Sequence, residues 1–343
     1  MTNEHAAETP RLGRETDDPC LVDMLDVARV AQQVETSAFR VPGAIRVVAP
    51  AKVNLFLDIG GKRPDGYHEA VSIMHALALH DTLLMRRTPG RGEGLSIQLT
   101  CRACEGTAPL DVAPEDNIVT KAIRLLARLT GRDAAEGVAV HVEKHIPSQA
   151  GLGGGSSDAA AALVGAARLW GLAADDPRIE EAARSLGADV AFFLHGGCAC
   201  LTGVGDVFDH ELAPMTSCVA LVKPEGGVST AAAYRAFDAD PVRIPDADRE
   251  AALAARDAAD VPLRNNLVQA SEELLPVLAD VRAWAEASPD VEQALMSGSG
   301  SAVFACCPSF DAAARVAAQA QARGWWARAT MFSSARAAVL PAR

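Results

Sequence analysis

The pattern of apolar and polar positions along the chain predicts strands in its first folded part. Residues 45–59 (I-R-V-V-A-P-A-K-V-N-L-F-L-D-I) are rich in β-branched and apolar residues, which is typical of a buried strand or of a hairpin interrupted at Pro50. After the turn G-G-K-R-P-D-G-Y-H, two further strands are predicted at residues 70–79 and 83–85. The folded body is therefore expected to begin near residue 45.

A glycine-rich segment separates a strand from a helix in the middle of the chain. An amphipathic helix is predicted at residues 117–129, with Asp116 as its cap. The strand V-A-V-H-V-E-K-H-I at residues 138–146 then leads into A-G-L-G-G-G-S-S. An alanine-rich helical pattern, D-A-A-A-A-L-V-G-A-A-R-L-W, follows directly. The local order is thus strand, glycine loop, helix.

This order favours a loop that binds a polyphosphate. The first turn of a helix has N–H groups without intrahelical partners and a positive potential, and glycines let the backbone approach an anion closely. Ser156 and Ser157 add hydroxyl donors at the helix start. A flexible glycine linker is the alternative, but linkers seldom lie between a strand and a helix. Neither G-K-[ST] nor G-x-G-x-x-G with a ribose-binding acid is in register, so this is a third kind of nucleotide loop.

Composition limits the classes of protein that fit. The chain has 343 residues, of which 49% are hydrophobic and 22% charged, as in an ordinary globular protein with two domains. It has no long apolar run and no secretory leader pattern, so we expect a cytoplasmic protein that does not span a membrane. The net charge of −12 argues against a nucleic acid partner, because binding to phosphate backbones favours a basic surface.

Residues 1–43 differ from the rest of the chain. They contain eight acidic residues and four arginines, three prolines and one weakly helical piece at residues 21–34. We expect a poorly ordered acidic extension. An organelle transit peptide would be basic and poor in acids, so that interpretation is rejected. A start codon placed upstream of the functional chain is an alternative origin for these residues.

The eight cysteines predict no metal centre. Only Cys101 and Cys104, in C-R-A-C, have the spacing of zinc ligands, and a second such pair is missing. Cys306 and Cys307 lie in an apolar strand-like run, where reduced cysteines behave as small apolar residues. We therefore expect reduced, structural thiols.

Two charged residues occupy positions that are unusual for their chemistry. Lys52 lies within the apolar run V-V-A-P-A-K-V-N-L-F-L, where its ammonium loses hydration unless an anion compensates. A lysine on an edge strand that points to solvent is the alternative. Asp189 lies in S-L-G-A-D-V-A-F-F-L, where an aspartate is also a favoured N-cap for the helix that follows. From spacing alone, the cap is the preferred role of Asp189.

Five segments resemble the successive signatures of the 4-diphosphocytidyl-2-C-methyl-D-erythritol kinases. They are A-P-A-K-V-N-L-F-L, G-K-R-P-D-G-Y-H, P-x-x-A-G-L-G-G-G-S-S-D-A-A, L-G-A-D-V-A-F-F-L and M-S-G-S-G-S-A-V-F-A, and they span residue 45 to the carboxyl end. This family belongs to the superfamily of galactokinase, homoserine kinase, mevalonate kinase and phosphomevalonate kinase, the GHMP kinases. The glycine loop alone marks the superfamily, whereas A-K-x-N-L-F-L with D-G-Y-H indicates this family.

The resemblance implies the fold. It predicts a two-domain α+β kinase, with an N-terminal kinase domain at residues 44–202 that carries the glycine loop. Residues 203–343 would form a C-terminal GHMP kinase domain with a ferredoxin-like lobe, and ATP and the second substrate would meet between the domains. Periodicity alone predicts only a mixture of α and β structure.

The resemblance also implies the activity. It predicts transfer of the ATP γ-phosphoryl group to the 2-hydroxyl of a cytidine-diphosphate-linked methylerythritol, within non-mevalonate isoprenoid synthesis. Asp189 would accept or orient the hydroxyl proton, and Lys52 would keep Asp189 ionised and stabilise the developing alkoxide. The residues implied in ATP binding are Ala150, Gly151, Leu152, Gly153, Gly154, Gly155, Ser156, Ser157 and Asp158.

Recognition of the second substrate is implied at aromatic and polar positions in both halves. The family places cytosine against Tyr67 and His68 and a second aromatic, which matches Tyr234, four residues after Thr230. Asn54 is implied near the transferring phosphate or the erythritol hydroxyl. The segment S-G-S-G-S adds Gly298, Ser299 and Gly300. A polar turn after P-D-G and a simple tight turn are the non-functional alternatives for these two segments.

The sequence departs from the family at three places. Ser148-Gln149-Ala150 stands where many relatives have further glycines, and Asn266 stands where relatives often have aspartate. Mg²⁺ should accompany ATP, yet no carboxylate cluster is apparent, so we expect phosphate, water and Ser157 as ligands. Another kinase of the superfamily and a catalytically silent nucleotide-binding protein remain alternatives, as a monomer or a homodimer.

Overall fold

The computed structural model describes residues 36–90, 94–104, 107–108, 112–132 and 136–341. The chain divides into two compact units, Met1–Val41 and Pro42–Arg343. Most of the predicted acidic extension at residues 1–43 lies outside the described residues, so its expected disorder stays a prediction. Within the described part, no helix is long and apolar enough to cross a membrane.

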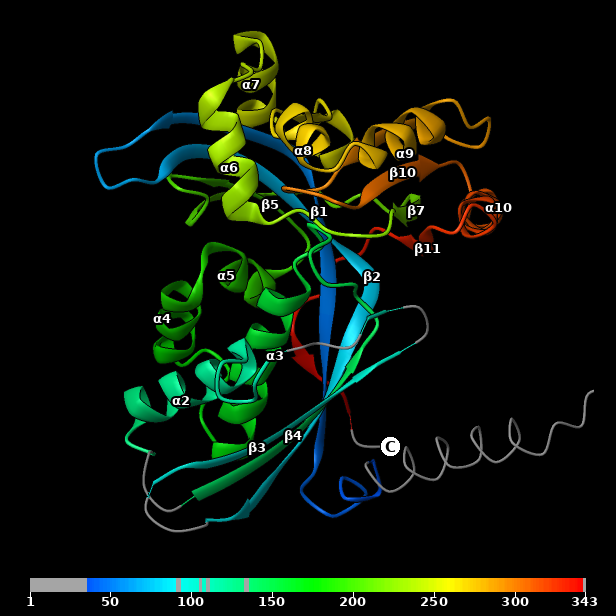
Figure 1. The fold of residues 1–343 in the computed structure, drawn as a ribbon. Coiled ribbons are helices and arrows are strands. Elements are labelled where there is room, and N and C mark those ends of the chain that lie inside the picture. Colours follow the sequence, from blue (N-terminus) through cyan, green and yellow to red (C-terminus); the bar gives the residue numbers. More distant parts are fainter. Residues whose placement is uncertain (1–35, 91–93, 105–106, 109–111, 133–135, 342–343) are drawn as a thin grey trace, which may run out of the picture. The chain divides into compact units, whose positions relative to one another are not determined.

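The larger sheet of the second unit is built around two long antiparallel strands, β1 and β2 (Figure 1). Its main path has the order β12-β1-β2-β4-β3, while β5 and β6 extend it from β2 and β8 pairs with β1. Among the strand pairs in the described part of this sheet, β3–β4 and β1–β8 are parallel and the others antiparallel. Its strands are β1 (Ile45–Lys62), β2 (His68–Pro89), β3 (Ser96–Ala103), β4 (Glu136–Lys144), β5 (Cys198–Thr202), β6 (Val207–Leu212), β8 (Arg264–Asn265) and β12 (Ala338–Val339).

The first two strands are longer than the apolar pattern predicts. Pro50 does not interrupt β1. The pairing with β2 shifts register between Pro50 and Lys52 and then continues. The segments predicted at residues 70–79 and 83–85 are parts of the single strand β2, since the residues between them remain paired with β1. The expectation of separate strands was therefore wrong. A bulge of this kind bends a strand without ending it.

Four helices cover one face of this sheet. They are α2 (Ile118–Thr130), α3 (Gly154–Trp170), α4 (Pro177–Leu186) and α5 (Ala188–His195). Their alanine-rich and aliphatic faces form one buried core with Val47, Met85 and Val140 of the strands. The predicted helix after residue 116 is present, but Asn117 caps it rather than Asp116. The Asn117 side chain accepts a hydrogen bond from the N–H of Val119 at 2.9 Å.

The smaller sheet has the antiparallel order β11-β7-β10-β9. Its strands are β7 (Cys218–Lys223), β9 (Gln293–Met296), β10 (Val303–Cys307) and β11 (Trp326–Met331). The helices of this part are α6 (Thr230–Ala239), α7 (Asp246–Ala254), the 3-10 turn η1 (Ala258–Asp260), α8 (Val268–Leu274), α9 (Val277–Glu286) and α10 (Phe310–Gln321). The sequence of elements and the strand order are those of a ferredoxin-like lobe, so this prediction is confirmed.

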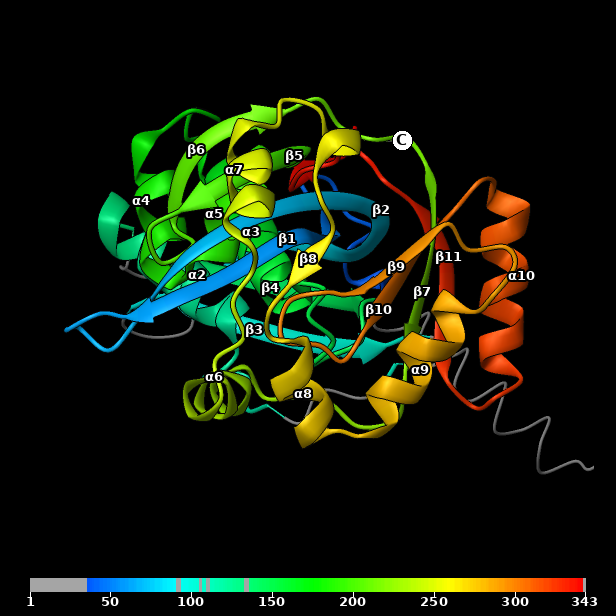
Figure 2. The same cartoon turned by 90° about the horizontal axis from the view of Figure 1, so that it is seen from above.

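The two sheets share a core through β1 and β2. One face of the smaller sheet packs on α9 and α10, and Figure 2 shows α10 beside β7 and β11. The opposite face, with Leu221 and Phe304, packs on Leu55, Phe56 and Ile73 of the long strands. The strands β8 and β12 return to the larger sheet after the smaller one has begun. The boundary at residue 203 stays a prediction.

Candidate active site

A cavity of about 690 Å³ is lined by residues of the larger sheet and its helices and by loops and helices next to the smaller sheet. Its walls include β1, β2, the glycine loop with the start of α3, the start of α5, the start of α6 and the S-G-S-G-S turn. The predicted site residues that line it are Lys52, Asn54, Ala150, Gly151, Leu152, Gly153, Gly154, Gly155, Ser156, Asp158, Asp189, Thr230, Tyr234, Gly298, Ser299 and Gly300. Ser157, Tyr67 and His68 are not in its lining.

The glycine loop ends in an uncapped helix that faces the cavity. Gly153 is the N-cap of α3, has a left-handed φ of 71°, and offers no side chain to cap the helix. No described residue accepts a hydrogen bond from the N–H groups of Gly154, Gly155 or Ser156. The first turn of α3 contains no acidic residue. This end of the helix can therefore bind an anion such as phosphate through its backbone.

Packing explains why the loop needs glycine at Gly153 and Gly151. A Cβ on Gly153 would lie 2.7 Å from the ring of Phe193, and one on Gly151 would lie 2.0 Å from the carbonyl oxygen of Ser297. The Ser297 hydroxyl donates to the carbonyl of Gly151 at 2.9 Å. The N–H of Ala302 donates to the carbonyl of Ala150 at 3.0 Å. The glycine loop and the S-G-S-G-S turn are therefore bonded directly to each other.

Gln149 has a backbone conformation that favours glycine. Its φ is 51°, a left-handed conformation that glycine adopts freely and that other residues adopt at a free-energy cost. Its carbonyl oxygen accepts the N–H of Ser301 at 3.2 Å. The position thus has the backbone geometry that glycine satisfies best, and its carbonyl is bonded to the S-G-S-G-S turn.

Lys52 and Asp189 lie together in the cavity although they are far apart in the sequence. The Lys52 ammonium is 3.6 Å from the Asp189 carboxylate, and the exposed fractions of the two side chains are 5% and 38%. Lys52 also donates to Asn54 Oδ1 at 2.5 Å, and Asn54 donates to the Ser72 hydroxyl at 2.8 Å. The ammonium is thus fixed by two partners, while the carboxylate is half-exposed to the cavity.

The non-functional alternatives for these two residues were wrong. Lys52 does not point to solvent, since it is 4% exposed on a strand that is paired along its length. Asp189 is not the cap of α5, because the helix begins at Ala188 and Gly187 occupies the cap position without a side-chain hydrogen bond. Asp189 lies in the first turn of that helix. Its carboxylate is therefore free of a capping role.

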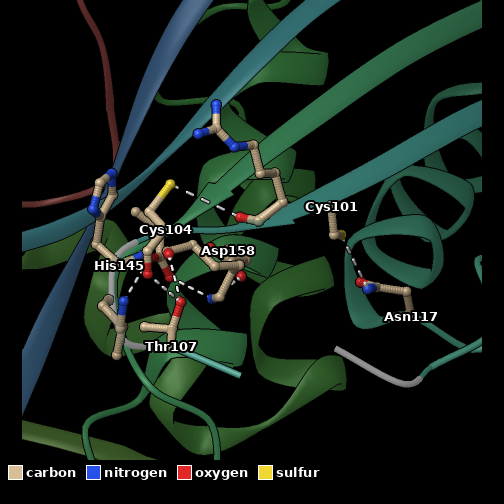
Figure 3. A network of polar contacts seen from close by, with 10 residues as sticks. Cys101, Cys104, Thr107, Asn117, His145 and Asp158 are labelled. Carbon is tan, nitrogen blue, oxygen red and sulfur yellow. Dashed lines mark hydrogen bonds and ion pairs between the residues drawn. The ribbon is translucent and has the colours of Figure 1, made fainter. Parts of the chain in front are cut away.

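A buried ionic network that sequence patterns do not predict lies at the start of α3, and Figure 3 labels two of its residues, Asp158 and His145. The Lys144 ammonium binds both Asp81 and Asp158, the latter at 2.5 Å. The other oxygen of Asp81 accepts the N–H groups of His145 and Ile146. Burial, only partly offset by Lys144, raises the pKa of Asp158 to about 7, whereas the two carboxylates raise the pKa of Lys144. The group therefore joins β2, β4 and α3 where the loop begins.

The rings of Tyr234 and His68 lie next to each other at the cavity wall formed by α6. Tyr234, on α6, is the one aromatic side chain among the described lining residues, and its ring centroid is 5.4 Å from that of His68. Burial, followed by the negative charge of Asp189, raises the pKa of Tyr234 to about 12, which keeps its hydroxyl protonated. Thr230 Oγ1 lies 3.0 Å from the Ser299 hydroxyl. Tyr67 is 65% exposed beside this group, on the β1–β2 hairpin.

The structure gives Asn266 a structural role. Its side-chain amide donates to the carbonyls of Ile59 and Val242, and its oxygen accepts the N–H of Ile59 at 2.9 Å. Asn266 is buried and does not line the cavity. An ionised aspartate could not donate either of the first two bonds. The amide is therefore the side chain that this environment requires.

The described lining offers few ligands for Mg²⁺. The acidic residues in the described lining are Asp116, Asp158 and Asp189, and the last two are already paired with lysines. The Ser157 hydroxyl is buried without a hydrogen-bond partner among the described residues, behind the lining. This arrangement fits an ion held mainly by phosphate and water with one or two carboxylates, as Mg²⁺ commonly is, rather than a protein cage.

One further group of possible metal ligands occurs among the described residues. Cys200, Asp209 and His210 offer ligand atoms within 4.8 Å of one another, on β5 and β6. His210 already uses Nδ1 toward Asp209 at 2.6 Å and Nε2 toward the Ala255 carbonyl at 2.8 Å. The Arg256 guanidinium lies 2.9 Å from Nε2. The Arg256 guanidinium thus already supplies a positive charge beside this group, and both ring nitrogens of His210 are occupied, so the group is not proposed as a metal site.

Comparisons with known proteins agree with this geometry. Residues 117–197 match the family model described as "GHMP kinases N terminal domain", and residues 249–324 match the one described as "GHMP kinases C terminal". A 4-diphosphocytidyl-2-C-methyl-D-erythritol kinase of Desulfitobacterium hafniense is 39% identical over 84% of this chain and 96% of that protein. The namesake from Salinispora tropica is 38% identical over 82% of this chain and 89% of its own length.

Solved structures show the same relationship. A crystal structure of 4-(cytidine 5'-diphospho)-2C-methyl-D-erythritol kinase aligns with a TM-score of 0.68 and 33% identity, over 84% of this chain and 99% of that one. Homoserine kinase from Cytophaga hutchinsonii aligns with a TM-score of 0.63 at 21% identity, over 87% of this chain and 98% of that chain, which shows the shared fold. The chain belongs to the 4-diphosphocytidyl-2-C-methyl-D-erythritol kinase family of the GHMP kinases.

Proposed function

We propose that the protein transfers the γ-phosphoryl group of ATP to the 2-hydroxyl of 4-(cytidine 5'-diphospho)-2-C-methyl-D-erythritol, releasing ADP and the 2-phosphate. The observation that carries the proposal is the contact of 3.6 Å between Lys52 and Asp189 in the same cavity as the uncapped end of α3. A phosphate-binding helix end and a paired cation and carboxylate are the parts that transfer to an alcohol requires. The family name supplies the acceptor.

Each residue then has a defined task. The N–H groups at the start of α3 bind the phosphates of ATP, and the half-exposed carboxylate of Asp189 accepts or orients the proton of the acceptor hydroxyl. The Lys52 ammonium, held by Asn54, keeps a positive charge beside the oxygen on which negative charge develops. Mg²⁺ would be held mainly by the phosphates of ATP and by water, and when bound with ATP it would neutralise phosphate charge.

The test is an ADP-release assay with three acceptors: the cytidine-diphosphate substrate, mevalonate and homoserine. Turnover with the first alone is expected. Turnover restricted to the other two would remove the acceptor assignment and favour another kinase of the superfamily. Binding of ATP without turnover of any acceptor would favour a silent nucleotide-binding protein.

A matched pair of variants separates catalysis from helix stabilisation. Asp189→Ala is expected to lower kcat about a hundredfold or more, since general bases contribute roughly 10²–10⁴-fold, and to leave ATP binding intact. Asp311 occupies the first turn of α10, is exposed and does not line the cavity. Asp311→Ala should therefore retain full turnover. Equal kcat for the two variants would refute the role of Asp189.

A further inference from the structure

A carboxylate outside the cavity binds two residues of the β1–β2 hairpin. Lys62 and His68 face each other across the hairpin, and both reach Asp238 on α6. His68 Nε2 lies 2.6 Å from Asp238 Oδ1, and the Lys62 ammonium lies 2.9 Å from Asp238 Oδ2. Asp238 is one helical turn after Tyr234, so the same helix presents the aromatic ring and the carboxylate. This arrangement ties the hairpin to the helix that lines the cavity.

The charge of Asp238 determines which nitrogen of His68 carries hydrogen. The hydrogen bonds from Lys62 and then from His68 hold the pKa of Asp238 below its usual range, so the carboxylate is ionised and can only accept. His68 Nε2 must therefore carry a hydrogen. In a neutral imidazole the other nitrogen, Nδ1, is then an acceptor with a free lone pair. No described residue donates to Nδ1 of His68.

The surroundings fix the plane of the imidazole as well as its tautomer. The Tyr234 ring lies 5.4 Å away at an interplanar angle of 59°, and the Phe237 ring lies 6.5 Å away at 79°. The His68 side chain is 6% exposed, so few other orientations are open to it. A flat base that stacks on Tyr234 from the cavity is adjacent to this ring. The uncommitted atom that His68 can offer to such a base is Nδ1.

We propose that Asp238 is a positioning residue that holds His68 in the Nε2–H tautomer, so that Nδ1 accepts from the amino group of cytosine and rejects the carbonyl oxygen of uracil. The inference rests on the proposed function, because it concerns the base of that substrate. Cytosine and uracil differ at this edge by a donor and an acceptor. Two acceptors facing each other lose a hydrogen bond and leave a desolvated lone pair unpaired. Asp238 thereby acts on base selection without touching the substrate.

The first experiment compares kcat and KM for the cytidine-diphosphate substrate and its uridine-diphosphate analogue at pH 8. Asp238→Ala is expected to reduce the cytidine-to-uridine ratio of kcat/KM about tenfold, the effect of one hydrogen bond, through KM with kcat nearly unchanged. Asp238→Asn keeps an acceptor oxygen and should restore much of the ratio. Lys62→Met removes the other partner of the same carboxylate and should retain the wild-type ratio.

The second experiment reads the tautomer directly and does not depend on turnover. Nitrogen-15 NMR of histidine-labelled protein, with His68→Gln used for assignment, should show a hydrogen on Nε2 alone in the wild type and in Lys62→Met, and a mixture of tautomers in Asp238→Ala. An unchanged ratio and an unchanged tautomer in Asp238→Ala would overturn the inference, as would a wild-type His68 with hydrogen on Nδ1. If the wild type showed the expected tautomer but no turnover of the cytidine substrate, the proposed function would fail while the positioning by Asp238 stood.

Discussion

Replacing Gly151 by alanine should damage both stability and nucleotide binding. Gly151 has a φ of 72°, and its added Cβ would lie 2.0 Å from the carbonyl oxygen of Ser297 and 2.9 Å from the carbonyl carbon. These atoms are backbone, so they cannot move aside as the end of a side chain can. The S-G-S-G-S turn must therefore shift away from the glycine loop, and the hydrogen bond from Ser297 to Gly151 must lengthen.

The magnitude follows from two terms. A non-glycine residue in the left-handed region costs roughly 1–2 kcal/mol. Forcing extra volume into a packed contact costs about 1–3 kcal/mol. Together they predict a loss of about 2–5 kcal/mol from the free energy of unfolding, which is a large share of the ~5–15 kcal/mol of a typical protein. The remaining folded fraction should have a raised KM for ATP, because the loop that carries the phosphate-binding N–H groups is displaced.

Gly155→Ala is the matched control for stability. Gly155 lies in the same loop–helix segment, but it has ordinary helical geometry and its added Cβ would meet nothing nearer than Ile118 Cγ2 at 4.0 Å. Alanine favours helix over glycine by up to about 1 kcal/mol, so this variant should be as stable as the wild type or slightly more so. Urea unfolding followed by circular dichroism measures all three proteins. If Gly151→Ala unfolds within about 1 kcal/mol of Gly155→Ala, the packing argument is wrong.

Three further predictions concern buried or strained positions. Burial lowers the pKa of His75 to about 4, so below the ordinary value of about 6.5 the unfolded chain binds more protons than the native state. Acidification from pH 6.5 to 4 should therefore lower the free energy of unfolding by about 3 kcal/mol. In urea titrations, His75→Gln should reduce this loss of stability at acidic pH. The raised pKa of Asp158, about 7, has the opposite sign: the native state binds more protons, so stability falls as pH rises, by about 1 kcal/mol between pH 6 and 8. Asp158→Asn should abolish that decline, because the asparagine side chain does not titrate between pH 6 and 8; an identical pH dependence would contradict the prediction. Gln149→Gly should raise the unfolding free energy by about 1 kcal/mol through relief of its left-handed φ, and a destabilised variant would show that the glutamine side chain matters more.

The local features of the site were predictable, and the long-range ones were not. The strand, glycine loop and helix at the start of α3 follow from periodicity and the conformational freedom of glycine. Periodicity says nothing about which distant residues meet. The contact of Lys52 with Asp189 was expected only because the sequence resembles a family, and the structure now supplies its distance.

Other features had weak or misleading signals. Lys144 lies on the same face of β4 as the valines of V-A-V-H-V, so alternation indicates burial, but its partners Asp81 and Asp158 come from two other elements. Asp116 and Asn117 are both good capping residues, and only the backbone angles of Asn117 decide between them. The role of Asp238 depends on a hairpin whose register sequence patterns do not determine. In each case the missing information is the pairing of elements rather than the chemistry of the residue.

The bonding between the two glycine turns has a consequence for how substrates enter. Hydrogen bonds join the segments that form the cavity walls. The N–H of Lys52 donates to the Leu152 carbonyl at 3.0 Å, and the Ser297 hydroxyl donates to the Gly151 carbonyl. Both halves also share the uninterrupted strand β1. Separating the walls of this cavity would require breaking these hydrogen bonds. We therefore expect nucleotide and acceptor to enter without separation of the two walls, so that exclusion of water from the transferring phosphate depends on the bound acceptor.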